Sequence, residues 1–243
     1  SLDSNLRSDA KRTFKPCEYE QSGRQVLCKR RPAVVDTARH ACQTRRFHSR
    51  RMKYLTVIRH AKSSWDQPGV PDHDRALNER GRRAAPAVAA FLHRTYFGGG
   101  GGEKLLPSPD RLVSSTALRA LTTAQIMRET FGMSADGLLL DSRLYLAPPQ
   151  VILNVVRGFD EKWNHVCIFG HNPGLHEFAD EILARASVPK MPTCTAVLLA
   201  LPHEFWGLAD WHEAQLIGYI TPKSLERRFP ELYGNISQGD GDD

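Results

Sequence analysis

The apolar positions of the chain fall into two alternating patterns. Short, nearly continuous apolar runs have the length of buried strands and occur at 54–59, 111–115, 137–145, 165–170, 195–201 and 215–220. Between them, apolar residues recur with the spacing of a helix at 77–97, 116–132, 148–159 and 172–186. Strands that are apolar on both faces and alternate with helices predict an α/β fold, a three-layer α/β/α sandwich with a mostly parallel sheet.

Residues at the ends of these segments support the helix assignments. Asn78 is a suitable N-cap for the first helix, and Ser115 or Thr116 for the second. Gly132 is placed to end the second helix, and Pro149 lies in the first turn of the third. These signals predict separate helices joined by short loops.

The α/β pattern occupies only part of the chain. Before residue 53 no apolar period persists, and after residue 230 the sequence becomes polar. We therefore predict a basic N-terminal extension at 1–52, one folded domain at 53–230 and a polar C-terminal tail at 231–243.

The positive charge of the chain belongs to the extension. Residues 1–53 hold 14 Lys and Arg against 5 Asp and Glu, whereas 54–243 hold 19 against 22, which together give the net charge of +6. The folded domain is thus mildly acidic, and we do not expect it to bind nucleic acid. No apolar run approaches the roughly 20 residues of a membrane helix, so no membrane partner is expected either.

Two features bear on the compartment. The five cysteines are odd in number and have no CxxC or Cys/His spacing, which is typical of reduced thiols in an intracellular protein. The extension is rich in Arg, Ser and Thr like a transit peptide, yet it carries five acidic residues, more than such peptides usually have. A plastid or mitochondrial protein and a cytoplasmic one with an N-terminal tail both remain open, and we expect a monomer.

Cationic and imidazole side chains follow three of the predicted strands. Arg59 and His60 end the first, Arg119 lies in the first turn after the second, and His171 follows the fourth at a helix N-terminus. Ligands of open α/β sheets bind beyond the carboxyl ends of strands, and helix N-termini attract anions. Because the arginine fork suits phosphate oxygens, these four residues predict a phosphoryl site that needs no metal and no cofactor.

Five motifs in order carry a resemblance to a known family. They are "RHAKSSW" (59–65), "DRALNERGRRAA" (74–85), "SSTALRALTTA" (114–124), "LY" (144–145) and "GHNPGL" (170–175). In this order they resemble the histidine phosphatase superfamily, with its phosphoglycerate mutase-like fold, and especially its SixA-like phosphohistidine phosphatase branch. The resemblance covers about 53–228. Ala61, Ala76 and Thr116 depart from the usual glycine and prolines, and none of these departures removes a charged group.

The resemblance implies a role for each candidate residue. His60 would be the nucleophile that is transiently phosphorylated, with one ring nitrogen free and the other N–H held by a backbone carbonyl. Arg59, Arg119 and His171 would bind the phosphoryl oxygens. Four further residues are predicted to bind substrate: Lys62, Ser63, Arg75 and Asn172.

The substrate is predicted from the leaving group. Alkyl phosphates need an acid to protonate a poor alkoxide leaving group, and the candidates Asp66, Asp72, Asp74 and Asp141 are not clearly placed. A phosphohistidine needs less help, which favours a phosphorylated protein as partner. Three alternatives stay open: a phosphatase of small phosphate esters with the same site, a non-catalytic phosphate-binding module, and a nucleic-acid-associated protein that acts through 1–53.

Overall fold

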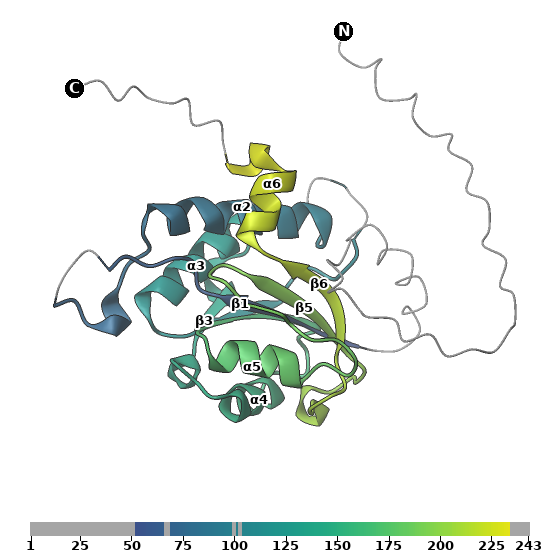
Figure 1. The fold of residues 1–243 in the computed structure, drawn as a ribbon. Coiled ribbons are helices and arrows are strands. Elements are labelled where there is room, and N and C mark those ends of the chain that lie inside the picture. The colour runs from purple at the N-terminus through teal and green to yellow at the C-terminus, as the bar shows by residue number, and fades with distance from the viewer. Residues whose placement is uncertain (1–51, 66–68, 99–100, 102–103, 234–243) are drawn as a thin grey trace, which may run out of the picture. The chain divides into compact units, whose positions relative to one another are not determined.

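The computed structural model describes residues 52–65, 69–98, 101 and 104–233 of the 243-residue chain (Figure 1). All of them belong to one compact unit, Val35–Asp243. The predicted extension at 1–52 lies outside the described residues except for Met52, and so does the predicted tail apart from 231–233. Both domain boundaries therefore stay predictions.

Strands and helices alternate along the described chain. The strands are β1 (Lys53–Arg59), β2 (Arg111–Ser114), β3 (Leu138–Leu140), β4 (His165–Gly170), β5 (Ala196–Leu201) and β6 (Gln215–Ile220). The helices are α2 (Glu79–Thr95), α3 (Leu118–Thr130), α4 (Pro149–Arg157), α5 (Gly174–Glu181) and α6 (Pro222–Arg228). Two short 3₁₀ segments matter for the site, η2 (Asp72–Asp74) and η5 (Ser142–Leu144).

The six strands form one sheet in the order β3-β2-β4-β1-β5-β6. The first four are mutually parallel, and β5 runs antiparallel to both of its neighbours. The predicted mostly parallel α/β sheet is thereby confirmed. Because β2, β4 and β1 are adjacent, their carboxyl ends open at the same place on the sheet edge.

Helices cover both faces of this sheet, as the prediction of three layers requires. Helices α2, α3 and α6 lie on one face, and α4 and α5 lie on the other (Figure 1). Along β1, Leu55 and Val57 belong to the apolar cluster under α4 and α5, whereas Ile58 belongs to the cluster under α2 and α3. This alternation follows from the two-residue period of a strand, and it explains why the central strand reads as apolar throughout.

The helix ends match the sequence in part. Asn78 is the N-cap of α2, where its side chain accepts a hydrogen bond from the Gly81 N–H at 2.9 Å, as predicted. Gly132, at φ +68°, follows Phe131, the C-cap residue of α3, and also confirms the prediction. The predicted cap of α3 is wrong, because Ala117 occupies the N-cap position and makes no side-chain cap bond.

No helix among the described residues is long and apolar enough to cross a membrane.

The loop after β1 packs directly on the first turn of α2. The Asn78 N–H donates to the Lys62 carbonyl at 3.0 Å, which ties the two segments together. A Cβ atom added to Gly81 would lie 2.2 Å from that same carbonyl oxygen. Since real Cβ atoms do not approach so closely, a glycine is required here for steric reasons rather than for its backbone angles.

We expect Gly81→Ala to destabilise the domain although alanine favours helices. Overpacking costs about 1–3 kcal/mol, which exceeds the gain of roughly 1 kcal/mol from helix propensity. Gly158→Ala is the matched control, because its nearest contact would be an ordinary 3.5 Å. Urea unfolding of both variants measures the difference, and equal midpoints would contradict the steric argument.

Candidate active site

The three adjacent strand ends bring Arg59, His60, Arg119 and His171 into one cluster, called here the phosphoryl cluster. Arg119 Nε donates to His60 Nε2 at 3.3 Å, and the rings of His60 and His171 lie 5.0 Å apart, centroid to centroid. His60, Arg119 and His171 are only 8%, 4% and 3% exposed. The residues that the sequence singled out from separate segments are therefore neighbours in a largely buried group of side chains that carries positive charge.

Backbone contacts fix the orientation of the His60 ring. His60 Nδ1 lies 2.7 Å from the Ala61 carbonyl, and a carbonyl can only accept, so the proton resides on Nδ1. Nε2 then carries the lone pair of the ring, which accepts the hydrogen bond from Arg119 Nε. The Ala61 N–H in turn donates to Thr123 Oγ1 at 3.0 Å, and the Thr123 hydroxyl donates to the Arg119 carbonyl at 2.7 Å. The segment after β1 and the first turns of α3 are thus held as one unit.

Both histidines of the cluster are neutral at neutral pH. The pKa of His60 is lowered to about 4, chiefly by burial and also by the charges of Arg119 and Arg59, against the opposing Ala61 hydrogen bond. Burial, together with the neighbouring His60 and Arg119, lowers the pKa of His171 to about 3. A neutral imidazole is what a nucleophilic histidine requires.

Two buried nitrogen atoms of the cluster have no hydrogen-bond partner among the described residues. They are Arg59 Nε and His171 Nδ1. Arg59 is anchored at its other end, where Nη1 donates to the Met191 carbonyl at 2.8 Å, and His171 Nε2 lies 2.9 Å from Ser115 Oγ. A buried unpaired donor costs roughly 1–3 kcal/mol, and an oxyanion between these two groups would satisfy both.

The four predicted substrate-binding residues lie around the cluster and not in it. Lys62 is exposed, and Ser63 is buried in a bridge to Leu77; in the described chain neither side chain contacts the cluster. Arg75 stacks on Trp65 at 3.5 Å and lies 3.7 Å from Asp72. Asn172 Nδ2 donates at 3.1 Å to the Met191 carbonyl that also holds Arg59. Their binding roles stay predictions.

Sequence reasoning did not assign a role to two residues that touch the cluster from outside. Asp72 Oδ2 accepts from Arg119 Nη2 at 2.8 Å and from the Tyr145 hydroxyl at 2.9 Å, and the Asp72 carbonyl accepts from Arg119 Nη1. Tyr145 also packs edge-on against His171, with ring centroids 5.4 Å apart. Asp72 was one of four acid candidates and Tyr145 belongs to the "LY" motif, but nothing in their spacing brings them together.

Two of the candidate acids, Asp72 and Asp141, are held as carboxylates. For Asp72, burial opposes ionisation, but hydrogen bonds from Tyr145 and Arg119 and the charges of Arg119 and Arg75 keep its pKa below the usual range. The Arg143 hydrogen bond lowers the pKa of Asp141 in the same way. Asp74 accepts from His73 at 3.0 Å, and Asp66 lies outside the described residues.

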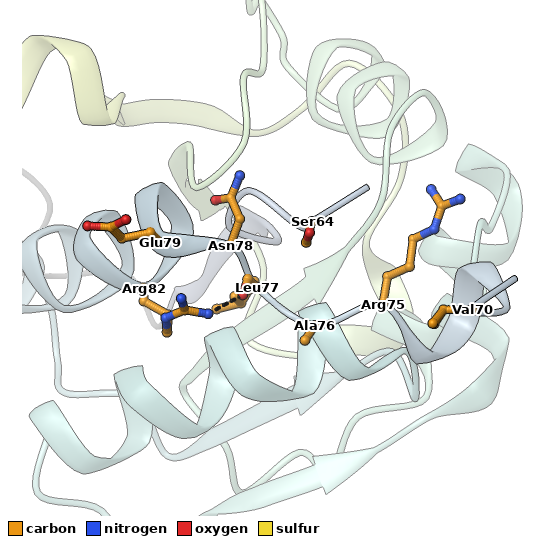
Figure 2. Close-up of a pocket in the computed structure, with 8 residues that line it drawn as sticks. All are labelled: Ser64, Val70, Arg75, Ala76, Leu77, Asn78, Glu79 and Arg82. Atoms are coloured by element: carbon orange, nitrogen blue, oxygen red, sulfur yellow. Dashed lines mark hydrogen bonds between the residues drawn. The ribbon is translucent and has the colours of Figure 1, made fainter. Parts of the chain in front are cut away.

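A recess of about 390 Å³ lies beside the start of α2. It is lined by residues of the β1–α2 loop and the start of α2, drawn in Figure 2: Ser64, Val70, Arg75, Ala76, Leu77, Asn78, Glu79 and Arg82. The Arg82 guanidinium is held at the Leu77 carbonyl, shown by the dashed line, so it is already engaged. The recess and the cluster are linked through Arg75 and Asp72. Among the described residues no group of three or more His, Cys, Asp and Glu side chains is arranged to hold a metal ion.

Comparisons with known proteins agree with this geometry. A model of the histidine phosphatase superfamily (branch 1) matches residues 55–139. An uncharacterized chloroplastic protein of Arabidopsis thaliana is 27% identical over 190 residues, 70% of this chain and 78% of that protein. An uncharacterized protein of Mycobacterium tuberculosis is 29% identical over 176 residues, 68% of this chain and all of that protein.

Solved structures share the fold. The protein histidine phosphatase SixA in complex with tungstate superposes with a TM-score of 0.56 at 16% identity, over 71% of this chain and 99% of that one. A structure from Agrobacterium tumefaciens, provisionally assigned as phosphohistidine phosphatase SixA, superposes with a TM-score of 0.56 at 24% identity. The match covers 70% of this chain and 98% of that one. At these identities the likeness establishes the fold.

The fold is a mixed α/β domain of the phosphoglycerate mutase-like type, and the phosphoryl cluster lies at the carboxyl ends of its central strands. The chain is similar to the histidine phosphatase superfamily, whose model matches the segment with Arg59, His60 and Arg119. This match supports phosphatase activity.

We expect the ring protons of His60 and His171 to titrate far below the ordinary histidine range, with midpoints near 4 and 3 in a proton NMR titration. Because folding favours the neutral rings, they stabilise the fold fully above the unfolded pKa of about 6.5, and this stabilisation is lost as pH falls through the folded values. His60→Ala and His171→Ala assign the signals. Midpoints near 6.5 would show that the rings are not desolvated.

Proposed function

We propose that this chain is a phosphatase that hydrolyses the N–P bond of phosphohistidine in proteins, through a covalent phosphohistidine on His60. One observation carries the proposal: a neutral imidazole, fixed by Ala61 with its lone pair on Nε2, accepts a hydrogen bond from Arg119 inside a cluster of buried arginine and histidine side chains. Arg59, Arg119 and His171 are the proposed ligands of the phosphoryl oxygens.

In the first step, His60 Nε2 attacks phosphorus in line with the bond to the leaving nitrogen. The Nε2–P bond forms, the N–P bond of the substrate breaks, and its electron pair stays on the departing imidazole. The His60 ring becomes cationic, and its Nδ1–H bond to the Ala61 carbonyl stabilises that charge. The two arginines and His171 stabilise the equatorial oxygens, where removing one such donor costs about 2.7–4 kcal/mol.

In the second step, water attacks the phosphoryl group on His60, the Nε2–P bond breaks, and inorganic phosphate leaves. The same cluster serves both steps, because the oxygens stay in place while only the leaving group changes. Neutral His60 is regenerated, and its low pKa favours this form for the next turnover.

The phosphohistidine substrate is supported by the state of the nearby carboxyl groups. Among the described residues, Asp72 and Asp141 have lowered pKa values, so neither is a ready proton donor for an alkoxide. A histidine side chain leaves as a neutral ring and needs no strong acid. The fold shared with the protein histidine phosphatase SixA agrees with this choice.

The compartment and the oligomeric state stay predictions. The relative from Arabidopsis thaliana is named chloroplastic, which favours the plastid over the mitochondrion if residues 1–52 form a transit peptide.

We expect the protein to form a phosphoenzyme that is stable in alkali and labile in acid when it is mixed with a radiolabelled phosphohistidine protein and quenched. His60→Ala abolishes the label because the acceptor nitrogen is gone. His93→Ala, a change of a histidine on α2 outside the cluster, retains it. Labelling of the His60→Ala variant would contradict the assignment of the nucleophile.

We also expect kcat/KM to be at least about tenfold higher for a phosphohistidine peptide than for an alkyl phosphate such as glycerol phosphate, because no described acid is poised to protonate an alkoxide. Steady-state release of phosphate from both substrates measures the ratio. The opposite preference would favour a phosphatase of small esters, and binding of phosphate without turnover of either substrate would favour a binding module.

A further inference from the structure

Asp72 lies at the outer edge of the phosphoryl cluster. Its carboxylate and its own carbonyl occupy both terminal nitrogens of Arg119, while Arg119 Nε faces His60. The side chain of Arg119 is 5% exposed and that of Asp72 is 45% exposed. Going outward from His60, the proposed nucleophile, the Arg119 guanidinium comes first, the Asp72 carboxylate follows it, and solvent lies beyond.

The neighbouring residues hold this carboxylate in place. Tyr145 donates to the same Oδ2 atom as Arg119 at 2.9 Å, and Arg75 lies 3.7 Å from Oδ1. His73, on the same 3₁₀ segment, packs edge-on against Tyr145 with ring centroids 5.2 Å apart, and its Nε2 lies 3.0 Å from Thr116 Oγ1. Asp72 is thus fixed by contacts to three other parts of the chain.

A fixed carboxylate at this place is unfavourable for an anionic leaving group. The attack by His60 Nε2 requires the leaving group to depart away from His60, and the solvent side is where Asp72 lies. An alkoxide or phenoxide that develops negative charge there would be repelled. A cationic group with an N–H would be attracted and could donate a hydrogen bond to the carboxylate.

We propose that Asp72 selects the leaving group: its carboxylate accepts a hydrogen bond from the distal ring N–H of the substrate's phosphorylated imidazole. The inference rests on the proposed function and narrows its substrate to the protonated, N-phosphorylated ring. Asp72 contacts the substrate directly, and Tyr145 acts through it as a positioning residue.

The chemistry balances without proton transfer to the enzyme. The substrate ring carries phosphorus on one nitrogen and hydrogen on the other, with a positive charge. When the N–P bond breaks, its electron pair neutralises the ring, which departs with its distal N–H still bonded to Asp72. His60 Nε2 takes the phosphoryl group. Asp72 therefore stays ionised throughout, in agreement with its depressed pKa.

Other ionisable groups face Asp72 and have to be considered in any test. Arg119 and Tyr145 form hydrogen bonds to it, and Arg75 lies beside it. Its negative charge also acts to raise the pKa values of His60 and His171. Substituting Asp72 will also loosen Arg119, so a simple loss of activity is no evidence for the proposal. Because Arg119 would contact the phosphoryl group of every substrate, that indirect effect lowers all rates alike, whereas the proposed hydrogen bond acts on one leaving group only.

The test compares kcat/KM for a phosphohistidine peptide and for p-nitrophenyl phosphate in the same enzyme preparations. We expect Asp72→Asn to lower the ratio of the two values about tenfold or more, the size of a charge-assisted hydrogen bond. Asp74→Asn is the matched control, since Asp74 is the next carboxylate along η2 and bonds to His73 instead of Arg119. It should leave the ratio within about twofold.

Each outcome has a distinct meaning. If Asp72→Asn lowers both values equally, Asp72 only supports Arg119 and the proposal is overturned. If the wild-type protein hydrolyses p-nitrophenyl phosphate but not the phosphohistidine peptide, the proposed function itself fails, and the inference fails with it. Tyr145→Phe, which keeps the carboxylate and removes one of its hydrogen bonds, should shift the ratio in the same direction by a smaller factor. An unchanged ratio in that variant together with an unfolded Asp72→Asn would also overturn the proposal.

Discussion

The hydrogen bond from His60 Nδ1 to the Ala61 carbonyl is the interaction on which the candidate chemistry depends. It places the proton on one ring nitrogen and leaves the lone pair on the other, which faces Arg119. The segment after β1 is held by the Ala61 N–H bond to Thr123 and by the His60 N–H bond to the Gly170 carbonyl at 3.1 Å, so the sheet, His60 and helix α3 are fixed together.

Burying this cluster has an electrostatic cost that its histidines help to limit. Two guanidinium groups lie close together, and their mutual repulsion contributes to the lowered pKa of Arg59, behind the larger effect of burial. The rings of His60 and His171 stay neutral and add no further charge. In the proposed function, an incoming phosphoryl group would supply the compensating negative charge, which favours an oxyanion over a neutral ligand.

Much of the architecture could be predicted from the sequence, because it depends on local patterns. Apolar runs and helical spacing gave the strands and helices, and the rule that ligands bind at strand ends grouped the four cluster residues. The Asn78 cap was also predictable, since its side chain bonds only three residues away. None of these inferences requires knowledge of contacts between residues that are distant in the sequence.

Interactions between distant segments were not predictable. Ser115 has the right chemistry for a helix cap, but its hydroxyl lies 2.9 Å from the His171 ring, a residue 56 positions away, and Ala117 takes the cap position instead. Likewise, Asp72 could be recognised as a carboxylate near the motifs, but its bond to Tyr145 joins residues 73 positions apart. The leaving-group side of the site depends on such contacts, which only the folded chain determines.

At two places a helix start and a loop of the site pack so closely that only glycine fits between them. A Cβ atom on Gly81 would lie 2.2 Å from the Lys62 carbonyl, and one on Gly174 would lie 1.9 Å from the Ala147 carbonyl. The first contact presses the loop after His60 onto α2, and the second presses the loop that follows Tyr145 onto the start of α5, next to His171. The glycines of "NERG" and "HNPG" are therefore steric requirements. They let the loop after His60 pack closely on α2 and the loop after Tyr145 pack closely on the start of α5, so the packing of both loops depends on the absence of a side chain at these two positions.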